Sequence, residues 1–477
     1  MAPSHYDSVA EKILLDLEMA VKKDATINEF DVIPTSEAEN RNSSPIVRGD
    51  CCLGLESWII PHIYPYAHHQ IMKKSNYKTQ NLEKVISCLL GVALLNPEMS
   101  TVWSRRRELI LSRKMTVDNE LRLTRMALSR KPKSNEALAH RRWVISEILN
   151  NVMDKATLLQ EELTLCEMIA NRYHSNYHAW SHRIWTLQHL LPSSMHWNVR
   201  KRTTKSTILD VSENNMPQHL FCRVSKSKYL SIVNSETFCV YSEEIDSNFK
   251  WVSSHVSDHS GFHFRKFLIT QICEFLKSNI CLNNSPDLEK DENLSIPVQC
   301  NSSSFFPTRK GILKEFLKSL EIDVCDRKIF GDYFKNLEEN SSLFDLIVCI
   351  LISEIKSNHT FCLMFPGHEA LWYYRRSIMF MFKKYILDNV HFSEQSVCSH
   401  HDKNGVPHKK DFKYDFTVDS KAENEQAKVS DFFGVFCMLL IKHEKEIISS
   451  FLKSHNESEN KFIKDYEHWL KFCLKIN

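Results

Sequence analysis

The residues best suited to chemistry gather in the stretch from Asn176 to Trp185, which reads Asn-Tyr-His-Ala-Trp-Ser-His-Arg-Ile-Trp. Imidazole and phenol groups exchange protons and donate hydrogen bonds, and a guanidinium binds carboxylates or phosphates. Trp180 and Arg183 are three residues apart, which puts them on one face of a helix. Tyr177, Trp180 and Ile184 follow the spacing of a buried helical stripe. The stretch therefore predicts an amphipathic helix with an aromatic buried face.

The pair formed by the central Trp and Arg recurs along the chain. A large apolar residue followed three positions later by Arg occurs at Trp103 and Arg106, Leu138 and Arg141, Trp180 and Arg183, Phe262 and Arg265, and Trp372 and Arg375. The first three copies are separated by 35 and 42 residues, the period of repeats built from two antiparallel helices. A stacking residue recurs with every repeat, whereas a catalytic residue is needed once, so we expect these ten residues to be structural.

These motifs resemble a known family. Repeats of the form Pro-x5-Trp-x2-Arg, with Asn-Tyr-His-Ala-Trp-x-His-Arg in the central copy, are similar to the protein prenyltransferase alpha-subunit repeat. The resemblance is strong from about Leu82 to Leu190 and weaker around Phe262 and Trp372. It implies an all-α fold, a right-handed solenoid of helical hairpins.

The resemblance also implies an activity and its partners. The chain would be the alpha subunit of a heterodimer that transfers a geranylgeranyl or farnesyl group from its diphosphate to a C-terminal cysteine of target proteins. The preference for geranylgeranyl rests on the resemblance alone. The partner would be a beta subunit of the geranylgeranyltransferase type, and that subunit would bind the zinc ion that activates the cysteine thiol.

The resemblance singles out the turn that precedes the central Trp. In this family the turn faces the beta subunit and contributes contacts near the prenyl diphosphate, and here it comprises His174, Ser175, Asn176, Tyr177 and His178. A helix N-terminus attracts anions, and Tyr and His add hydrogen-bond donors. The family has a basic residue where this chain has Ser175, and His174 supplies a charge only when protonated. The alternative is that Tyr177 and His178 are ordinary packing or interface residues.

No metal site is expected on this chain. The fifteen cysteines include no CxxC pair, so a cysteine-type zinc site is not predicted. His400, His401, Asp402 and His408 lie close together in a polar stretch, where solvated side chains are the favoured interpretation. Stand-alone catalysis is not supported either, because no catalytic triad, paired carboxylates or cofactor fingerprint is present.

The composition gives no support to several other classes of function. The 477 residues carry 61 Lys and Arg against 59 Asp and Glu, so charge gives no argument for nucleic acid or membrane binding. Only nine residues are glycine, and neither a Walker A motif nor GxGxxG is present. No apolar run is expected to be long enough to cross a membrane. The thiols are interpreted as reduced, which predicts the cytosol.

The expected layout has two parts, a flexible N-terminal segment at 1–50 and a helical solenoid at 51–477. Polar stretches predict loop insertions near 192–236, 278–308 and 393–430. A second hypothesis for the whole chain is a non-catalytic helical scaffold that binds a partner protein. The uncharged Ser175 favours the scaffold, whereas the Asn-Tyr-His sequence that follows it favours the enzyme subunit.

Overall fold

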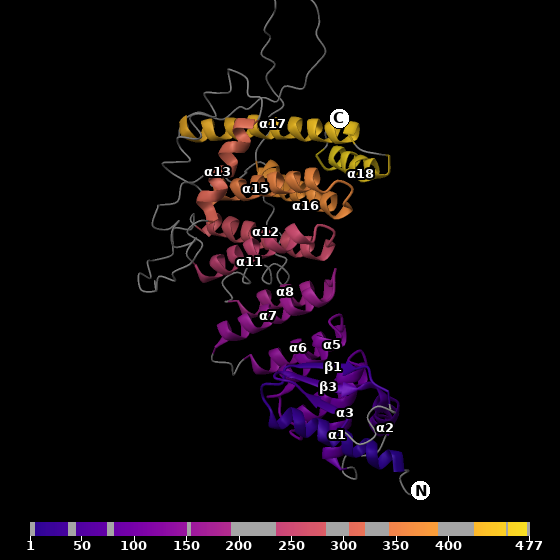
Figure 1. Ribbon diagram of the computed structural model, residues 1–477. Coiled ribbons are helices and arrows are strands. Elements are labelled where there is room, and N and C mark those ends of the chain that lie inside the picture. Colours follow the sequence, from indigo (N-terminus) through magenta and orange to yellow (C-terminus); the bar gives the residue numbers. More distant parts are fainter. Residues whose placement is uncertain are drawn as a thin grey trace, which may run out of the picture. The chain divides into compact units, whose positions relative to one another are not determined.

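The computed structural model describes residues 5–36, 44–73, 81–149, 154–191, 235–282, 305–319, 343–389, 424–454 and 457–474. The chain forms two compact units, Met1–Pro192 and Ser193–Asn477 (Figure 1). The division falls where the first insertion was expected. The greater part of all three expected insertions lies outside the described residues, as do His400, His401, Asp402 and His408.

Unit 1 begins with a mixed layer of helices and strands. Its elements are α1 (His5–Lys23), β1 (Glu29–Ile33), β2 (Ile46–Arg48), β3 (Cys52–Glu56), η2 (Ser57–Ile59) and α2 (Ile60–Met72). β1 pairs with β3 in parallel, and β3 pairs with β2 in antiparallel orientation. α1 and α2 pack against each other and against α3 (Leu82–Leu95).

This layer differs from the flexible segment expected at 1–50. The side chains of Leu14, Leu17 and Phe30 are almost completely buried. The Phe30 N–H donates to Ser129 Oγ at 2.9 Å, which ties β1 to the first helix of a later hairpin. The sheet was not predicted, because its strands are only three to five residues long and carry little periodic signal.

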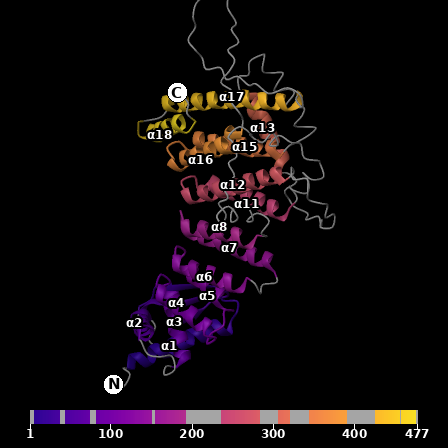
Figure 2. The same cartoon turned by 180° about the vertical axis from the view of Figure 1, so that it is seen from behind.

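Three helical hairpins complete unit 1. They are α3 with α4 (Ser100–Leu111), α5 (Glu120–Arg130) with α6 (Asn135–Ile148), and α7 (Lys155–Arg172) with α8 (Tyr177–Leu190). The first helices α3, α5 and α7 pack on one another in sequence, and so do the second helices α4, α6 and α8. The unit therefore has two layers of helices, whose hairpins are seen from both sides in Figures 1 and 2.

Unit 2 repeats the hairpin plan with longer helices. Its elements are α11 (Glu236–Ser254), α12 (His259–Leu282), α13 (Phe305–Ser319), α15 (Leu343–Met364), α16 (Glu369–Tyr385), η6 (Leu387–Asn389), α17 (Asn424–Ser454) and α18 (Glu457–Leu474). α11 packs on α12, α15 on α16 and α17 on α18, while α13 lies against α15. The expected helical-hairpin repeat fold is confirmed.

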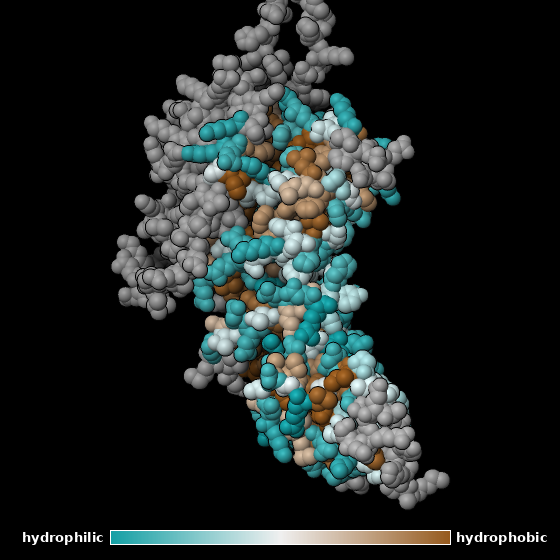
Figure 3. All heavy atoms as spheres, viewed as in Figure 1, coloured by the Kyte–Doolittle hydropathy of each residue, from teal (hydrophilic) through white to brown (hydrophobic). Residues whose placement is uncertain are grey.

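Among the described helices, one is long and apolar enough to cross a membrane by length and composition alone. This helix is α15, and 72% of its most apolar 18-residue window is buried inside the protein. A helix buried on all sides at the centre of a helical unit has the same composition. On the face seen in Figure 3, brown hydrophobic patches over the sheet region and over α15 and α16 are small and are surrounded by hydrophilic residues.

Candidate functional site

Each motif Arg that has a described carboxylate partner forms a buried two-point ion pair. Arg106 Nη2 lies 2.5 Å from Glu120 Oε1, and Arg141 Nη2 lies 2.6 Å from Glu162 Oε1. The Nε atom of each Arg donates to the second oxygen of the same carboxylate. The Glu always belongs to the first helix of the next hairpin. The pairs Arg265–Glu354 and Arg375–Glu444 repeat the arrangement in unit 2.

A second donor reaches each of these carboxylates from its own hairpin. His140 Nε2 lies 2.8 Å from Glu120 Oε2, and His182 Nε2 lies 2.9 Å from Glu162 Oε2. In unit 2 a Tyr hydroxyl takes this position, because Tyr374 donates to Glu354 and Tyr466 donates to Glu444. Glu120, Glu162, Glu354 and Glu444 are therefore each shared between two neighbouring hairpins.

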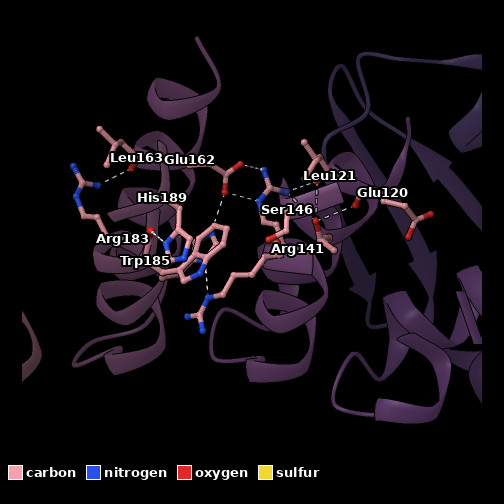
Figure 4. Close-up of polar contacts among 12 residues, drawn as sticks. Glu120, Leu121, Arg141, Ser146, Glu162, Leu163, Arg183, Trp185 and His189 are labelled. Carbon is pink, nitrogen blue, oxygen red and sulfur yellow. Dashed lines mark hydrogen bonds and ion pairs between the residues drawn. The ribbon is translucent and has the colours of Figure 1, made fainter. Parts of the chain in front are cut away.

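The motif Arg also holds its own hairpin together. Arg141 Nη1 donates to the Leu121 carbonyl and to Thr124 Oγ1 on α5, while its other nitrogens bind Glu162 (Figure 4). Arg183 donates to the Leu163 carbonyl at 2.7 Å in the same way. One guanidinium thus connects three helices, and its five N–H donors suit this task.

The protonation states follow from this geometry. Burial alone would raise the pKa of Glu120 and Glu162, but the neighbouring Arg and His lower each pKa to about 2. Burial lowers the pKa of His140 and His182. Each imidazole is then neutral, with Nε2–H donating to the carboxylate and Nδ1 accepting from the Nε of another Arg. Charge is balanced inside the protein, which is typical of a structural network.

The repeated large residues lie in the core beside this network. Trp103, Leu138, Trp180, Phe262 and Trp372 are each at most 5% exposed. The Trp103 indole donates to the Pro97 carbonyl at 2.7 Å, and its ring stacks on the His140 imidazole. The first contact fixes the turn between α3 and α4, and the second joins α4 to α6 of the next hairpin.

The candidate turn presents some of its residues and buries others. Asn176 is 1% exposed, and its side chain donates to the Pro132 and Ile169 carbonyls and accepts from the Ala179 N–H. Tyr177 is 55% exposed, His174 is exposed, and Ser175 and His178 are half-buried. Asn176 is therefore the N-cap of α8, while the other four side chains can meet a partner.

One sequence expectation about this helix was wrong. Tyr177 was placed on a buried stripe with Trp180 and Ile184, but Tyr177 points to the surface. The buried face instead carries Trp180, Arg183 and Leu187. Ile184 is only half-buried, so Tyr177 and Ile184 lie at the edge of the buried face.

The surface around the turn is polar and aromatic. Lys133 Nζ lies 4.0 Å from the centroid of the Tyr173 ring, so the turn before α6 supplies a cation next to the turn before α8. The N-terminus of α8 adds a partial positive charge. The described ranges contain no group of three or more His, Cys, Asp or Glu side chains able to hold a metal ion. The turn can bind an anion or a protein surface, but it holds no activated nucleophile.

Sequence reasoning missed the acidic half of the network. Glu120, Glu162 and Glu354 each stand twenty residues before a His or Tyr that directly precedes a motif Arg. This fixed spacing was the available signal. Glu244 stands at the same spacing before Phe264 and is 7% exposed, so the position is acidic and buried in α11 as well.

Comparison with known proteins agrees with the repeat pattern. The sequence matches the family described as protein prenyltransferase alpha subunit repeat at residues 117–148, 159–190 and 241–272. These segments correspond to the hairpins α5–α6, α7–α8 and α11–α12. The hairpins α3–α4, α15–α16 and α17–α18 lie outside the matched segments, yet the same Arg and Glu contacts join them to their neighbours.

Several curated proteins are similar to most of this chain. The chain is 30% identical over 385 residues to protein prenyltransferase alpha subunit repeat-containing protein 1-B of Xenopus laevis, an alignment that covers 80% of this chain and 74% of that protein. It is 26% identical over 392 residues to protein prenyltransferase alpha subunit repeat-containing protein 1 of Homo sapiens, with 78% of each chain covered. The resemblance noted in the sequence is thereby confirmed, and the chain belongs to the protein prenyltransferase alpha subunit repeat family.

Proposed function

We propose that this chain is the alpha subunit of a heterodimeric protein prenyltransferase in the cytosol. The heterodimer transfers a geranylgeranyl or farnesyl group from its diphosphate to a C-terminal cysteine of a target protein. Family membership supports the class of protein. The observation that best supports a role near the substrates is the turn before α8, where the buried Asn176 anchors an exposed Tyr177 and a half-buried His178.

In the proposed reaction this chain only binds and positions the substrates. A bond forms between the cysteine sulfur and the first prenyl carbon, the bond from that carbon to oxygen breaks, and diphosphate leaves. Zinc on the beta subunit would bind the sulfur of the target cysteine and favour its thiolate form. Tyr177, His178 and His174 bind the departing diphosphate or position the lipid, and the N-terminus of α8 favours the negative charge that develops.

Substitutions in the turn test this role within a reconstituted heterodimer. Tyr177→Ala with His178→Ala should lower prenyl transfer by about 100- to 1,000-fold, since removing a donor to a developing charge has effects of this size. Asn135→Ala is the matched control, because Asn135 is the exposed residue after the N-cap of α6. The control should keep full turnover. Unchanged turnover in the double variant, with the heterodimer intact, would rule out this use of the turn.

A non-catalytic scaffold is the second candidate, and Ser175 favours it. A serine with a φ of 55° stands where the family has a basic residue. Ser175→Lys distinguishes the two candidates. In an enzyme subunit the added amine should strengthen prenyl diphosphate binding to the heterodimer, whereas in a scaffold it should change only the surface charge.

A further inference from the structure

Two arginines of unit 1 lack the carboxylate partners that their neighbours have. Arg107 and Arg142 directly follow the motif residues Arg106 and Arg141. Both are half-buried, but neither forms an ion pair with a carboxylate in the described ranges of the chain. A cation that is partly removed from water without an anion is costly, so an anion supplied from outside would stabilise it.

The neutral histidines orient both guanidinium groups. Arg107 Nε donates to His140 Nδ1 at 3.2 Å, and Arg142 Nε donates to His182 Nδ1 at 3.2 Å. The Arg107 guanidinium lies 5.7 Å from the centroid of the Trp143 ring. With Nε occupied, the Nη1 and Nη2 groups remain as a two-donor edge, the geometry that binds a carboxylate at two points.

Burial shifts the pKa of both guanidinium groups in the same direction. Burial is the main cause that lowers the pKa of Arg107 and of Arg142. The carboxylate that opposes this for Arg107 is Glu136, which lies beyond ion-pair distance. For Arg142 the opposing groups are Cys166 and Tyr177, neither of which is a carboxylate. Both arginines remain charged and short of negative partners.

The two positions are equivalent in neighbouring hairpins. Arg107 lies on α4 and Arg142 on α6, and these helices pack against each other. Packed helices lie about 8–10 Å apart. Two residues seven positions apart on a single helix are separated by a rise of about 10 Å. The spacing of the two helices that carry the arginines therefore matches that of two such residues on a partner helix. The row ends at α8, where Ile184 takes the position and Trp185 stacks on the His189 ring (Figure 4).

We propose that Arg107 and Arg142 form a docking surface for an acidic helix of a protein partner, with two carboxylates about seven residues apart. Trp, Tyr and Arg are enriched at the centres of protein interfaces, and Trp143 lies beside the Arg107 guanidinium. Nucleic acid is a poorer match, because its backbone is bound by many cations and the chain has a net charge of only +2. The partner is the beta subunit, and in that respect the inference rests on the proposed function.

Binding measurements on the full chain with recombinant prenyltransferase beta subunits test the surface. Arg107→Gln with Arg142→Gln should raise the dissociation constant by about 30-fold or more, as expected when buried interfacial charges lose their partners. It should also reduce the dependence of binding on salt. Arg105→Gln is the control, because Arg105 lies on the same helix and pairs with Glu108. Its effect should stay below about fivefold. Equal affinity and salt dependence in the double variant and the wild type would overturn the proposal.

A second variant distinguishes loss of binding from loss of folding. Arg107→Lys with Arg142→Lys keeps both charges and introduces amines that a carbodiimide couples to nearby carboxylates. Amide cross-links from these positions to Asp or Glu of the partner support the surface, and their absence in an intact complex contradicts it. If the wild-type chain assembles with no beta subunit, the proposed function fails. Binding to poly-L-glutamate then tests the surface without a partner. If poly-L-glutamate retains the wild type and the double Gln variant equally, the proposed docking surface is overturned.

Discussion

Glu162 contributes to stability through three donors at once. It receives two hydrogen bonds from Arg141 and one from His182, and it is completely buried. Replacing a buried ion pair as a whole by apolar groups is often neutral, but removing one partner leaves the other charge unpaired. The network therefore specifies which helices meet, and its value appears when a single member is lost.

Glu162→Ala should lower the free energy of unfolding by about 3–5 kcal/mol, because Arg141 then stays buried without its carboxylate. Chemical denaturation followed by tryptophan fluorescence measures the change. The adjacent Glu161 is exposed, and Glu161→Ala should change stability by less than about 0.5 kcal/mol. Equal effects of the two substitutions would show that the buried network contributes nothing specific.

The buried histidines predict a dependence of stability on pH. Burial holds the pKa of His140 and His182 below the ordinary value, so the unfolded chain binds protons there more readily. Stability is therefore complete above a pH of about 6.5 and declines as the pH falls toward the lowered values in the folded chain. The pKa of about 2 at Glu120 keeps this carboxylate charged throughout that range.

Thermal unfolding between pH 7.5 and 5.5 measures this effect. The wild type should lose stability as the pH falls, whereas His140→Gln with His182→Gln should be less stable at pH 7.5 and show a smaller decline. Glu120 and Glu162 add their own loss only below a pH of about 4.5. A decline of the same size in the double variant would contradict neutral histidines in the folded protein.

At the scale of helices, the N-caps connect one hairpin to the next. Ser134 Oγ donates to the Pro97 carbonyl, and the Asn176 amide donates to the Pro132 carbonyl. Each cap also accepts an N–H of the helix that it starts. The residue before each second helix thus sets both where that helix begins and where it lies against the preceding hairpin.

Asn176→Ser and Asn176→Ala separate these two roles. Ser keeps an acceptor for the Ala179 N–H, as Ser134 does for α6, but loses the amide that donates to both carbonyls, while Ala loses all three hydrogen bonds. Both should destabilise unit 1, with Ala costing about 1 kcal/mol more than Ser, the usual value of an N-cap. Amide hydrogen exchange in the first turn of α8 should rise more for Ala than for Ser. Equal protection in the two variants would contradict capping by this side chain.

The sequence predicted the helices, whose apolar residues recur with a clear period, and it missed the strands, which have no such period. The hairpins from α3 to α8 follow from apolar spacing, from breaks at Pro97 and Pro132, and from the recurring Arg. The three-stranded sheet was missed because its short strands gain their stability from packing, as Phe30 does against Ser129. Pairing between Arg141 and Glu162 depends on which helices meet, and periodicity within a single helix does not contain that information.

The candidate turn was foreseen only in part. The Asn-Tyr-His sequence drew attention to it, but Asn176 is buried as a cap whereas Tyr177 is exposed. Helical spacing grouped Tyr177 with Trp180 and Ile184, but Ile184 is only half-buried and the buried face is centred on Trp180, Arg183 and Leu187. Which side chains of the turn are exposed therefore depends on where the neighbouring helices pack, which the spacing does not contain.

At the scale of the whole chain, the repeats build a network of buried ion pairs between helices. Arg106, Arg141, Arg265 and Arg375 each pair with a buried carboxylate of the next hairpin. In the proposed function, partners meet the exposed turn before α8 and the half-buried Arg107 and Arg142 of α4 and α6. In the proposed function the chain acts as part of a complex with other proteins.

Co-expression of the full chain with prenyltransferase beta subunits tests the central claim most directly. Any stable complex is assayed for prenyl transfer with geranylgeranyl diphosphate and with farnesyl diphosphate. The account predicts an equimolar, zinc-containing heterodimer that transfers one of the two lipids to a protein with a C-terminal cysteine. A well-folded chain that assembles with no beta subunit, or an equimolar complex without transfer to any such protein, would contradict it.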